Sequence, residues 1–430
     1  MITKRFLCLL LAVVTVFMFC ACGAERIPDG SMSESGTVNG TAENEEEQFN
    51  PLEIVKLSED FVSITEKQMP DAEFSAAYRH FTAEIFAKSR VSGKNSLISP
   101  LSVIYALAMT FTGAEGETLE QFLRAFDGKG DIDIDRIGAC LPGIPSGACR
   151  TESAISVANS IWVKNTPGLR LKDDFVDKNR RYYQADIYAA PFNDSTLQEI
   201  NGWVSANTYG RIKQILEKLN ADAVMCLVNA ILFDARWKTA FERTEKREFN
   251  KANGDKETVE MMYSDEFTYI KTKKAVGFEK KYSTGYSFIA VLPDGTLEDY
   301  MATFDGVEIA NILSARKTDD VSVGMPSFEY DFSADLIPVL QEMGVTDAFT
   351  GAADFSGISE DFSAYISQVV HKTRIEVTAE GTTAAAATAV EMTKTAANPH
   401  ESKSVVLNRP FLYMIIGGND TPLFIGTFEG

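Results

Sequence analysis

The sequence predicts an α+β fold, because helix-like patterns gather in its first half and strand-like patterns in its second. Apolar residues recur at helical spacing over residues 71–90, which places them on one face of a helix. The run Val224–Phe233 is almost entirely apolar, as expected of a central strand that is covered on both faces. Strand-like segments then dominate the region 247–293. The apolar positions of the first helix are Phe74, Tyr78, Phe81 and Ile85.

A second helix is predicted from Leu101 to about Thr112, ending at Gly113. Ser99 is a good N-cap because its hydroxyl can accept a hydrogen bond from a free backbone N–H, and Pro100 suits the first helical position. The segment is apolar nearly all round, so we expect it to be buried in the centre of a large domain.

The remaining elements are predicted from the helical spacing of apolar residues and from the alternation that is typical of strands. The predicted helices are 116–126, 171–183, a helix capped by Asp194 that runs to about Tyr209, and 334–343. The predicted strands are 154–163, 185–190, 369–377, 411–417 and 423–427. No internal repeat is present.

The composition argues against binding to nucleic acid. The chain has 430 residues, 45% of them hydrophobic, and a formal net charge of −20. Phosphate backbones are bound by clustered Lys and Arg, so no nucleic-acid partner is expected. The same charge disfavours binding to an anionic lipid surface. The acidity fits the solubility of a secreted protein.

The N-terminus has the pattern of a targeting segment. Lys4 and Arg5 precede an apolar stretch of 14 residues, 6–19, which is too short for an ordinary membrane span. Shortly after the stretch comes Ala21-Cys22, which resembles a bacterial lipobox. We therefore expect residues 1–21 to be a lipoprotein signal peptide and Cys22 to carry a lipid anchor. An ordinary cleaved signal peptide is the alternative.

Residues 22–66 are predicted to form a flexible tether, and residues 67–430 the folded domain. The tether is rich in Gly, Ser, Glu and Asn, and such a composition buries too little apolar surface to fold alone. The expected location is extracellular, as a lipoprotein on the surface of a bacterium.

Three cysteines remain in the predicted domain. Cys226 lies in an apolar strand and is expected to be a buried small hydrophobe. Cys140 and Cys149 flank a turn-rich loop and could pair in an oxidising compartment, although the sequence does not require it.

Small residues dominate the segment 379–390, in which Gly381 supplies the backbone freedom for a pivot. Side chains alternate along extended chain, so every second residue shares one face. A segment that slides between two existing strands needs small side chains, because each bulky one would cost about 1–3 kcal/mol of overpacking. A flexible linker is the alternative interpretation. The face in question carries Thr382, Ala384, Ala386, Thr388 and Val390.

Seven motifs in a fixed order, spread over residues 67–430, resemble those of the serpin family. The first two are Asn95-Ser96-Leu97-Ile98-Ser99-Pro100-Leu101-Ser102, and Leu227–Phe233 followed by Arg236-Trp237-Lys238-Thr239-Ala240-Phe241. The next three are Met325-Pro326-Ser327-Phe328, Asp354-Phe355-Ser356-Gly357-Ile358 and Val370-His371-Lys372. The last two are Arg409-Pro410-Phe411 and Pro422-Leu423-Phe424-Ile425-Gly426.

The resemblance implies a single domain of three β-sheets, about eight or nine helices and an exposed reactive-centre loop. It also implies a suicide-substrate mechanism. A serine protease cleaves the loop and forms an acyl-enzyme, and the freed loop then inserts into the main sheet and distorts the protease. Such a protein is a stored-strain switch and not an enzyme. It needs no cofactor or metal, and we expect a monomer.

The resemblance also assigns roles to residues. The sheet-opening region would contain Ser99, Ser102, Asn229, His371 and Trp237. The loop hinge would be formed by Glu380, Gly381, Thr382, Thr383, Ala384, Ala385, Ala386, Ala387 and Thr388.

The scissile bond in this family usually lies fourteen residues after the hinge glycine, which here gives Thr395-Ala396. A small residue before the bond suits an elastase-like or subtilisin-like target. Lys394-Thr395 and Ala396-Ala397 are the alternative bonds, and Lys394 would suit a trypsin-like protease. The chain departs from the family at Ala379, where many members have an acidic residue, and Glu380 stands beside it.

The sequence also bears on three other functions. A non-inhibitory serpin that acts as a binding protein would be favoured by charged, bulky or Pro residues in the hinge, and 382–388 has none. An inhibitor of a cysteine protease is a further alternative. A hydrolase is disfavoured, because the chain has three histidines and neither a Gly-x-Ser-x-Gly nor a His-Glu-x-x-His motif. The triple Asp131, Asp133, Asp135 mimics a calcium loop, but Arg136 stands where that loop needs Gly.

Overall fold

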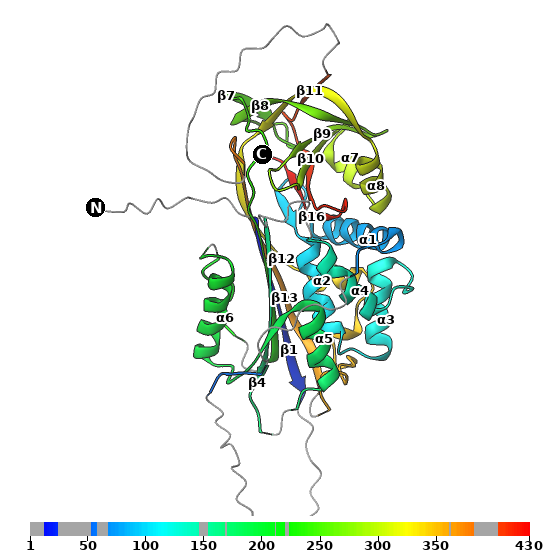
Figure 1. Cartoon of the computed structure of the whole chain (residues 1–430), viewed down its shortest axis with the longest axis vertical. Coiled ribbons are helices and arrows are strands. Elements are labelled where there is room, and N and C mark those ends of the chain that lie inside the picture. Colours follow the sequence, from blue (N-terminus) through cyan, green and yellow to red (C-terminus); the bar gives the residue numbers. More distant parts are fainter. Residues whose placement is uncertain are drawn as a thin grey trace, which may run out of the picture.

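The computed structural model describes residues 13–24, 53–57, 68–145, 154–167, 170–210, 212–219, 223–360, 363–381 and 403–430. Its main sheet has seven strands in the order β12-β13-β1-β6-β4-β5-β2, and it runs vertically through Figure 1. All neighbours in this sheet are antiparallel except β4 and β5. In that order the strands are Phe328–Asp335, Ser363–Val377, Val13–Ala24, Ala223–Phe233, Ile155–Lys164, Ala185–Ala190 and Val55–Lys56.

The other nine strands are connected by backbone hydrogen bonds, and they divide into two sheets. The order is β14-β11-β8-β9-β10-β15-β16-β3, and β7 pairs with β8. The two parts are joined only where Tyr269–Lys271 of β8 pairs with β9, which gives three sheets in the described chain. In that order these strands are Lys403–Val406, Arg316–Pro326, Lys256–Lys271, Ala275–Lys281, Ser287–Pro293, Phe411–Ile416, Pro422–Phe428 and Ser96–Ile98, with β7 at Arg243–Asn250.

Nine α-helices pack around these sheets in the described residues, which confirms the predicted α+β class. In Figure 1, α6 lies on one face of the main sheet, while α2 and α5 lie on the other. The helices α1 to α5 are Ala72–Ser89, Pro100–Phe111, Gly116–Asp127, Ile134–Cys140 and Asp173–Tyr183. The helices α6 to α9 are Asp194–Asn207, Leu297–Met301, Gly306–Ser314 and Ile337–Glu342. Short 3₁₀ turns occupy Leu141–Gly143 and Asp347–Phe349.

The central helix α2 forms as its sequence predicts. The Ser99 side chain accepts a hydrogen bond from the N–H of Ser102, and Pro100 occupies the first turn. Every residue of the helix is buried, because it packs against β6 and β1 of the main sheet and against β16 of the second. The helix therefore links the two large sheets.

Two predicted helix starts were wrong. The α6 helix is capped by Asn193, which accepts hydrogen bonds from the N–H groups of Ser195 and Thr196, while Asp194 is the first helical residue. The helix predicted from residue 334 begins only at Ile337, because β12 keeps its pairing with β13 as far as Asp335. Backbone pairing with β13 is therefore formed there in place of the helix that the local pattern predicts.

Three short helices were missed by the sequence pattern. They are α4, α7 and α8, and each has a side chain that caps its first turn. The caps are Asp133, Thr296 and Asp305, which accept from the N–H three residues later. Asp133 thus belongs to a helix start, consistent with the rejection of a calcium loop.

The folded contacts begin before the predicted domain boundary at residue 67. Val55 and Lys56, inside the predicted tether, pair with Ala189 and Tyr188 of β5. The N–H of Leu57 also donates to the carbonyl of Ile187 at 2.7 Å. This short strand closes the edge of the main sheet, where unpaired backbone groups would otherwise remain.

The strand β1, Val13–Ala24, overlaps the predicted signal peptide 1–21 and extends into the predicted tether as far as Ala24. It lies between β6 and β13 and pairs with both in the antiparallel sense. Its sequence Val-Val-Thr-Val-Phe-Met-Phe is rich in β-branched and aromatic residues. A segment that is apolar at consecutive positions suits a strand whose two faces are both covered. In the whole chain, this segment is thus a central strand of the main sheet.

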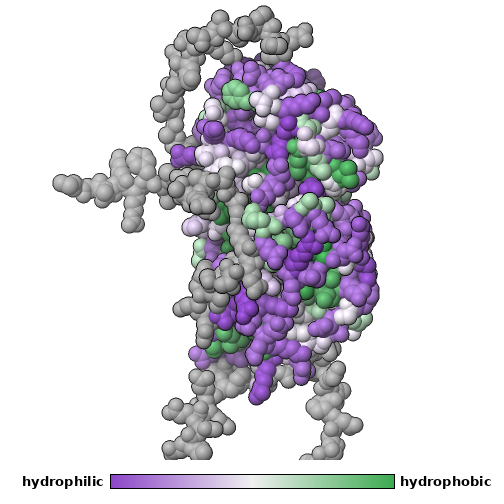
Figure 2. All heavy atoms as spheres, turned by 45° about the vertical axis from the view of Figure 1, so that its right-hand side comes forward, coloured by the Kyte–Doolittle hydropathy of each residue, from purple (hydrophilic) through white to green (hydrophobic). Residues whose placement is uncertain are grey.

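The core consists of two buried clusters, one on each face of the main sheet. The larger one joins α1, α2 and the second sheet, and the smaller one lies between the main sheet and α6. Alternate residues of β6 contribute to the two clusters, so this strand is buried on both faces. The face shown in Figure 2 is largely hydrophilic, with hydrophobic residues in scattered patches, in keeping with the charge of −20.

Candidate functional site: the sheet-opening region and the loop hinge

A chain of buried side chains connects α2 to the main sheet. Ser102 Oγ donates to Asn229 Oδ1, and Asn229 Nδ2 donates to Asn159 Oδ1 at 2.7 Å. Asn159 Nδ2 then donates to the carbonyl oxygen of Tyr183 at 2.6 Å. Because these side chains are buried, each lost partner would leave a polar group without water to replace it. The chain therefore ties β6 and β4 to the helices α2 and α5.

His371 joins the same region from β13. Its Nε2 accepts a hydrogen bond from the backbone N–H of Ser99 at 3.2 Å, and Ser99 Oγ donates to the carbonyl of Leu423 at 2.9 Å. His371 is fully buried, and this burial lowers its pKa to about 3. The imidazole is therefore neutral at pH 7, which lets Nε2 act as an acceptor.

The strand β1 separates the two sides of this region. Phe17 is the register partner of both His371 on β13 and Asn229 on β6. The structure thus brings Ser99, Ser102 and Asn229 together by hydrogen bonds, and His371 joins them through the backbone of Ser99. Asn159, which sequence reasoning missed, extends the network. A lone Asn in a strand-like run was the only signal for it.

The hinge begins with a tight turn at the end of β13. The N–H of Thr378 donates to the carbonyl of Gly381 at 3.1 Å, and the N–H of Gly381 donates back at 3.4 Å. This mutual pair closes a two-residue turn at Ala379 and Glu380. The chain has therefore reversed direction by Gly381 and points back along β13.

Glycine is required at position 381. Its φ is +135°, and a Cβ there would lie 2.7 Å from the Cα of Arg236 and 2.8 Å from the backbone N of Trp237. Gly381 forms β-bridges on both sides, with Thr378 and with Arg236. A side chain would break this close approach of three backbones. Gly381, which the sequence predicts to be a pivot, is thus packed closely against neighbouring backbone.

Trp237 holds the base of the hinge. Its Nε1 donates to the carbonyl of Thr378 at 2.9 Å, and its ring stacks on Tyr282 at a centroid distance of 4.3 Å. The next contact is backbone to backbone, where Phe241 N–H donates to the carbonyl of Ala379 at 2.8 Å. These contacts attach the turn to the segment between β6 and β7. A role of Trp237 at the start of insertion stays a prediction.

A buried ion pair beneath Trp237 was not predicted. Lys280 Nζ pairs with Glu266 and lies 4.2 Å from the ring centroid of Phe241 and 5.6 Å from that of Trp237. Burial lowers the pKa of Lys280, and Glu266 opposes that shift. A cation over an aromatic ring gains energy when it is desolvated. Nothing in the sequence distinguishes Lys280 from its exposed neighbour Lys281.

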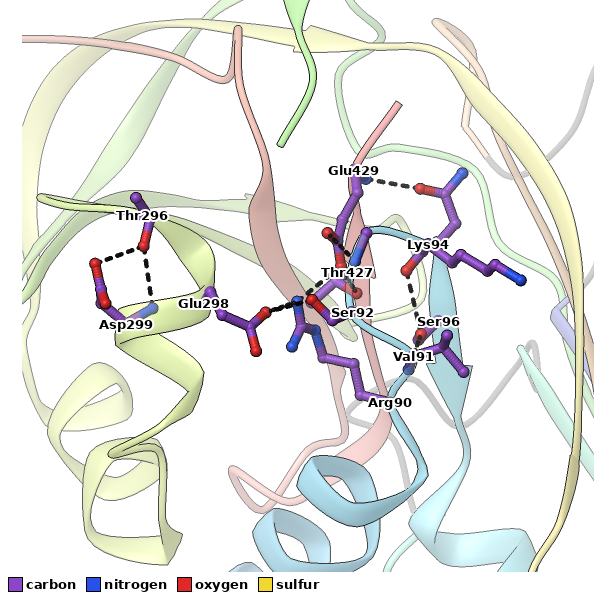
Figure 3. Close-up of polar contacts among 12 residues, drawn as sticks. Arg90, Val91, Ser92, Lys94, Ser96, Thr296, Glu298, Asp299, Thr427 and Glu429 are labelled. Atoms are coloured by element: carbon purple, nitrogen blue, oxygen red, sulfur yellow. Dashed lines mark hydrogen bonds and ion pairs between the residues drawn. The ribbon is translucent and has the colours of Figure 1, made fainter. Parts of the chain in front are cut away.

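Polar contacts fasten the end of the chain to the turn after α1, as Figure 3 shows. Arg90 Nη2 donates to Glu429 Oε1 at 3.0 Å and to Glu298 Oε2 at 2.9 Å. The backbone N–H of Glu429 donates to Asn95 Oδ1 at 2.7 Å, and Gly93 N–H donates to Glu429 Oε2 at 3.0 Å. Burial raises the pKa of Glu429, and Arg90 opposes the shift. These contacts fix the end of β16 against the turn that leads into β3 and Ser99.

Several predicted residues lie outside the described part of the chain. They are Thr382, Thr383, Ala384, Ala385, Ala386, Ala387, Thr388, the candidate bond residues Lys394, Thr395 and Ala396, and Cys149. Cys140 is buried, and burial raises the pKa of its thiol to about 11. Glu380 is exposed, and Ala379 packs against the large core.

The described residues contain neither a candidate metal cluster nor a helix that could span a membrane. No group of three or more His, Cys, Asp and Glu residues is arranged to hold a metal ion there. The helices of the described segments include none with the length and apolarity to cross a membrane.

Comparison with known proteins agrees with this geometry. The family model "Serpin (serine protease inhibitor)" matches residues 76–429. The chain is 31% identical over 392 residues to a leukocyte elastase inhibitor of Equus caballus, covering 83% of this chain and 99% of that protein. It is 32% identical over 365 residues to an uncharacterized serpin-like protein of Methanosarcina mazei, covering 80% and 84%.

A solved structure shows the same architecture. The native state of tengpin, a thermophilic serpin, has a TM-score of 0.78 and 35% sequence identity, and the match covers 88% of this chain and 100% of that one. A fold with three sheets, a buried central helix and a glycine hinge defines the class of protein. The chain belongs to the serpin family.

Proposed function

We propose that the protein inhibits serine proteases as a suicide substrate, by inserting its cleaved reactive-centre loop into the main sheet. The observation that carries this proposal is the hinge turn. Gly381 already forms a bridge to the end of β13 on one side and to Arg236, just after β6, on the other. Those two strands flank the position that an inserted loop would take. The first residue of a new strand is therefore in place.

The two bridges at Gly381 give one and the same register for the inserted loop. Extending the pairing of Thr378 with Gly381 along β13 puts Thr382 opposite Val377 and Thr388 opposite His371. Extending the pairing of Arg236 with Gly381 along β6 puts Thr388 opposite Asn229. In the structure, β1 independently has Phe17 opposite both His371 and Asn229. The two bridges therefore predict the same register, in which the loop can pair with β6 and β13 at the same time.

This register decides which loop side chains face the core. The β13 residues opposite even-numbered loop positions are buried, and they are Val377, Ile375, Thr373, His371 and Val369. The β13 residues between them, such as Glu376 and Arg374, are half-exposed. The even-numbered positions carry the small or β-branched set that begins at Thr382. Small side chains on that face avoid the overpacking cost of about 1–3 kcal/mol for each bulky one.

The proposed target is an elastase-like or subtilisin-like protease that cleaves Thr395-Ala396. Small and β-branched residues before the bond fit a shallow pocket, whereas a trypsin-like pocket pairs the charge of a Lys or Arg. The similarity to a leukocyte elastase inhibitor supports this choice. Cleavage after Lys394 by a trypsin-like protease and inhibition of a cysteine protease are the competing targets.

A non-inhibitory binding protein is the second candidate function. Ala379 favours it, since many inhibitory relatives are expected to have an acidic residue at that position. The hinge residues 382–388 argue against it, because none is charged, bulky or Pro. The turn at Ala379 and Glu380 is also well formed, with both of its backbone hydrogen bonds.

The proposed location is the outer surface of a bacterial cell. The charged start, the apolar stretch 6–19 and the Ala21-Cys22 pair support removal of residues 1–21 and lipidation of Cys22. The acidic, polar segment that follows would hold the domain away from the membrane. We propose that the protein acts there as a monomer.

The test is trapping of protease by the purified protein that lacks the predicted signal peptide, residues 1–21. It is incubated with elastase, subtilisin and trypsin, and an SDS-stable covalent adduct is sought. The proposal predicts an adduct with elastase or subtilisin. Loop cleavage without any adduct would favour the non-inhibitory candidate, and an adduct with trypsin alone would move the bond to Lys394.

A matched pair of variants separates insertion from simple cleavage. In the proposed register, Thr382 faces the core opposite Val377, while Thr383 faces the half-exposed side opposite Glu376. Thr382→Arg buries a charge without a partner, which is severely unfavourable. Thr383→Arg places the same charge beside a carboxylate. The proposal therefore predicts loss of adduct for Thr382→Arg alone.

A further inference from the structure

The strand β1 occupies the position that the inserted loop needs. Its residues pair with β13 from Val14 to Ala24 and with β6 from Val13 to Cys22. Both of its edges are hydrogen-bonded, so β6 and β13 have no free edge left toward each other. A sheet position holds one strand at a time, and the two segments therefore compete for it.

The competition concerns the same register positions. Position Phe17 of β1 lies opposite His371 and Asn229, the two residues that the hinge register assigns to Thr388. On β13, the β1 pairing is continuous from Val14 to Cys20. Those seven positions correspond to loop residues 385–391, because the offset between the segments is constant. The overlap therefore covers the middle of the loop.

The β1 segment is well suited to stay in this position. The neighbouring strand β6 is buried on both faces, one against α2 and the larger core and the other against the smaller core under α6. A strand beside it gains most when both of its faces are apolar. The β1 sequence is apolar at nearly every position, whereas the loop offers Ala and Thr. A larger apolar side chain gains more than Ala or Thr at a strand position that is covered on both faces, so the β1 sequence is favoured over the loop.

We propose that the segment Val13–Ala24, as long as it is attached to the chain, is an autoinhibitory plug that keeps the reactive-centre loop out of the main sheet. A plugged chain is cleaved at the loop and releases its protease, so it behaves as a substrate. Removing or displacing the segment opens the position and activates trapping. The activity readout of this proposal rests on the proposed inhibitory function, but the position of the plug does not.

Two cysteines of the chain allow the position of β1 to be tested directly. Cys20 on β1 is the register partner of Cys226 on β6. Residues directly opposite on antiparallel strands have Cβ atoms about 4.5–5.5 Å apart, and a disulfide needs only slightly less. Mild oxidation of the purified full chain is expected to give a Cys20–Cys226 disulfide, mapped by mass spectrometry of non-reduced peptides. Cys22→Ser should keep this crosslink, and Cys20→Ser should lose it.

Activity is then compared between full-length variants. Phe17→Asp places a charge at the centre of β1 and should displace the segment. Phe6→Asp makes the same change ahead of the strand and serves as the matched control. With elastase or subtilisin, the yield of SDS-stable adduct should rise for Phe17→Asp and stay at the wild-type level for Phe6→Asp. Oxidation before the assay should abolish trapping in any chain that forms the crosslink.

The outcomes separate the two proposals. Absence of the Cys20–Cys226 crosslink in the oxidised full chain overturns the plug, and so does undiminished trapping by the crosslinked chain. A crosslink that forms in the wild type and is lost in Phe17→Asp supports the plug even if neither protein traps a protease. In that last case, it is the inhibitory function that fails.

Discussion

Replacing Asn229 by Ala tests whether the buried network holds the main sheet to α2. The Asn229 side chain accepts from Ser102 Oγ and donates to Asn159 Oδ1 at 2.7 Å. The substitution leaves those two buried groups without their partners. Each unsatisfied buried group costs about 1–3 kcal/mol, so the expected loss in the free energy of unfolding is about 2–6 kcal/mol. This exceeds the average effect of a point mutation.

The loss is measured by urea unfolding, followed by tryptophan fluorescence and by circular dichroism. Asn253→Ala is the matched control, because Asn253 lies in an exposed turn and bonds only to nearby Asp255. A surface change of that kind is expected to stay within about 0.5 kcal/mol. If Asn229→Ala loses less than about 1 kcal/mol, the network does not hold the sheet and the reasoning on this region is refuted.

Three further predictions concern the hinge, the buried histidine and the anchor. Thr382→Arg should turn the inhibitor into a substrate that is cleaved and released, and unchanged stoichiometry of trapping would disprove insertion at this hinge. His371 has a pKa of about 3 when folded and about 6.5 when unfolded, so the unfolded state binds more protons between these values. Neutral, buried His371 should stabilise the fold fully above pH 6.5, and below that pH the free energy of unfolding should fall by up to about 1.4 kcal/mol per pH unit. In urea unfolding at pH 7 and pH 5, His371→Phe should lack this part of the pH dependence. Cys22→Ser should release the protein from membranes or block its maturation, and unchanged membrane fractionation would exclude the lipid anchor.

Much of the fold could be predicted from local sequence. The start of α2 follows from Ser99-Pro100, because capping is a contact between residues three apart. The two-sided burial of β6 follows from its continuous apolar run. The short helices α7 and α8 could not be predicted in this way. They have five and nine residues, too few to show a helical period.

The site was predicted in part, through its resemblance to a family. The residues around Ser99 and His371 are brought together by pairing across hundreds of positions, which no local pattern reveals. Lys280 is buried because Glu266 and two aromatic rings surround it, and these partners come from β8 and from the segment between β6 and β7. The position of β1 was missed for a similar reason. An apolar stretch after two basic residues has the pattern of an export signal, and the pattern carries no information about an open position in a distant sheet.

The central claim is that the loop is cleaved at Thr395-Ala396 and traps the protease as it inserts. The most direct measurement is mass spectrometry of the C-terminal peptide that elastase or subtilisin releases, together with denaturing electrophoresis of the same reaction. The account predicts a covalent adduct and a peptide that begins at Ala396, and Thr395→Arg should shift the preference toward trypsin. A peptide that begins at Thr395 would move the site to Lys394. In protein that lacks residues 1–21, cleavage without an adduct for every protease tested would contradict the account.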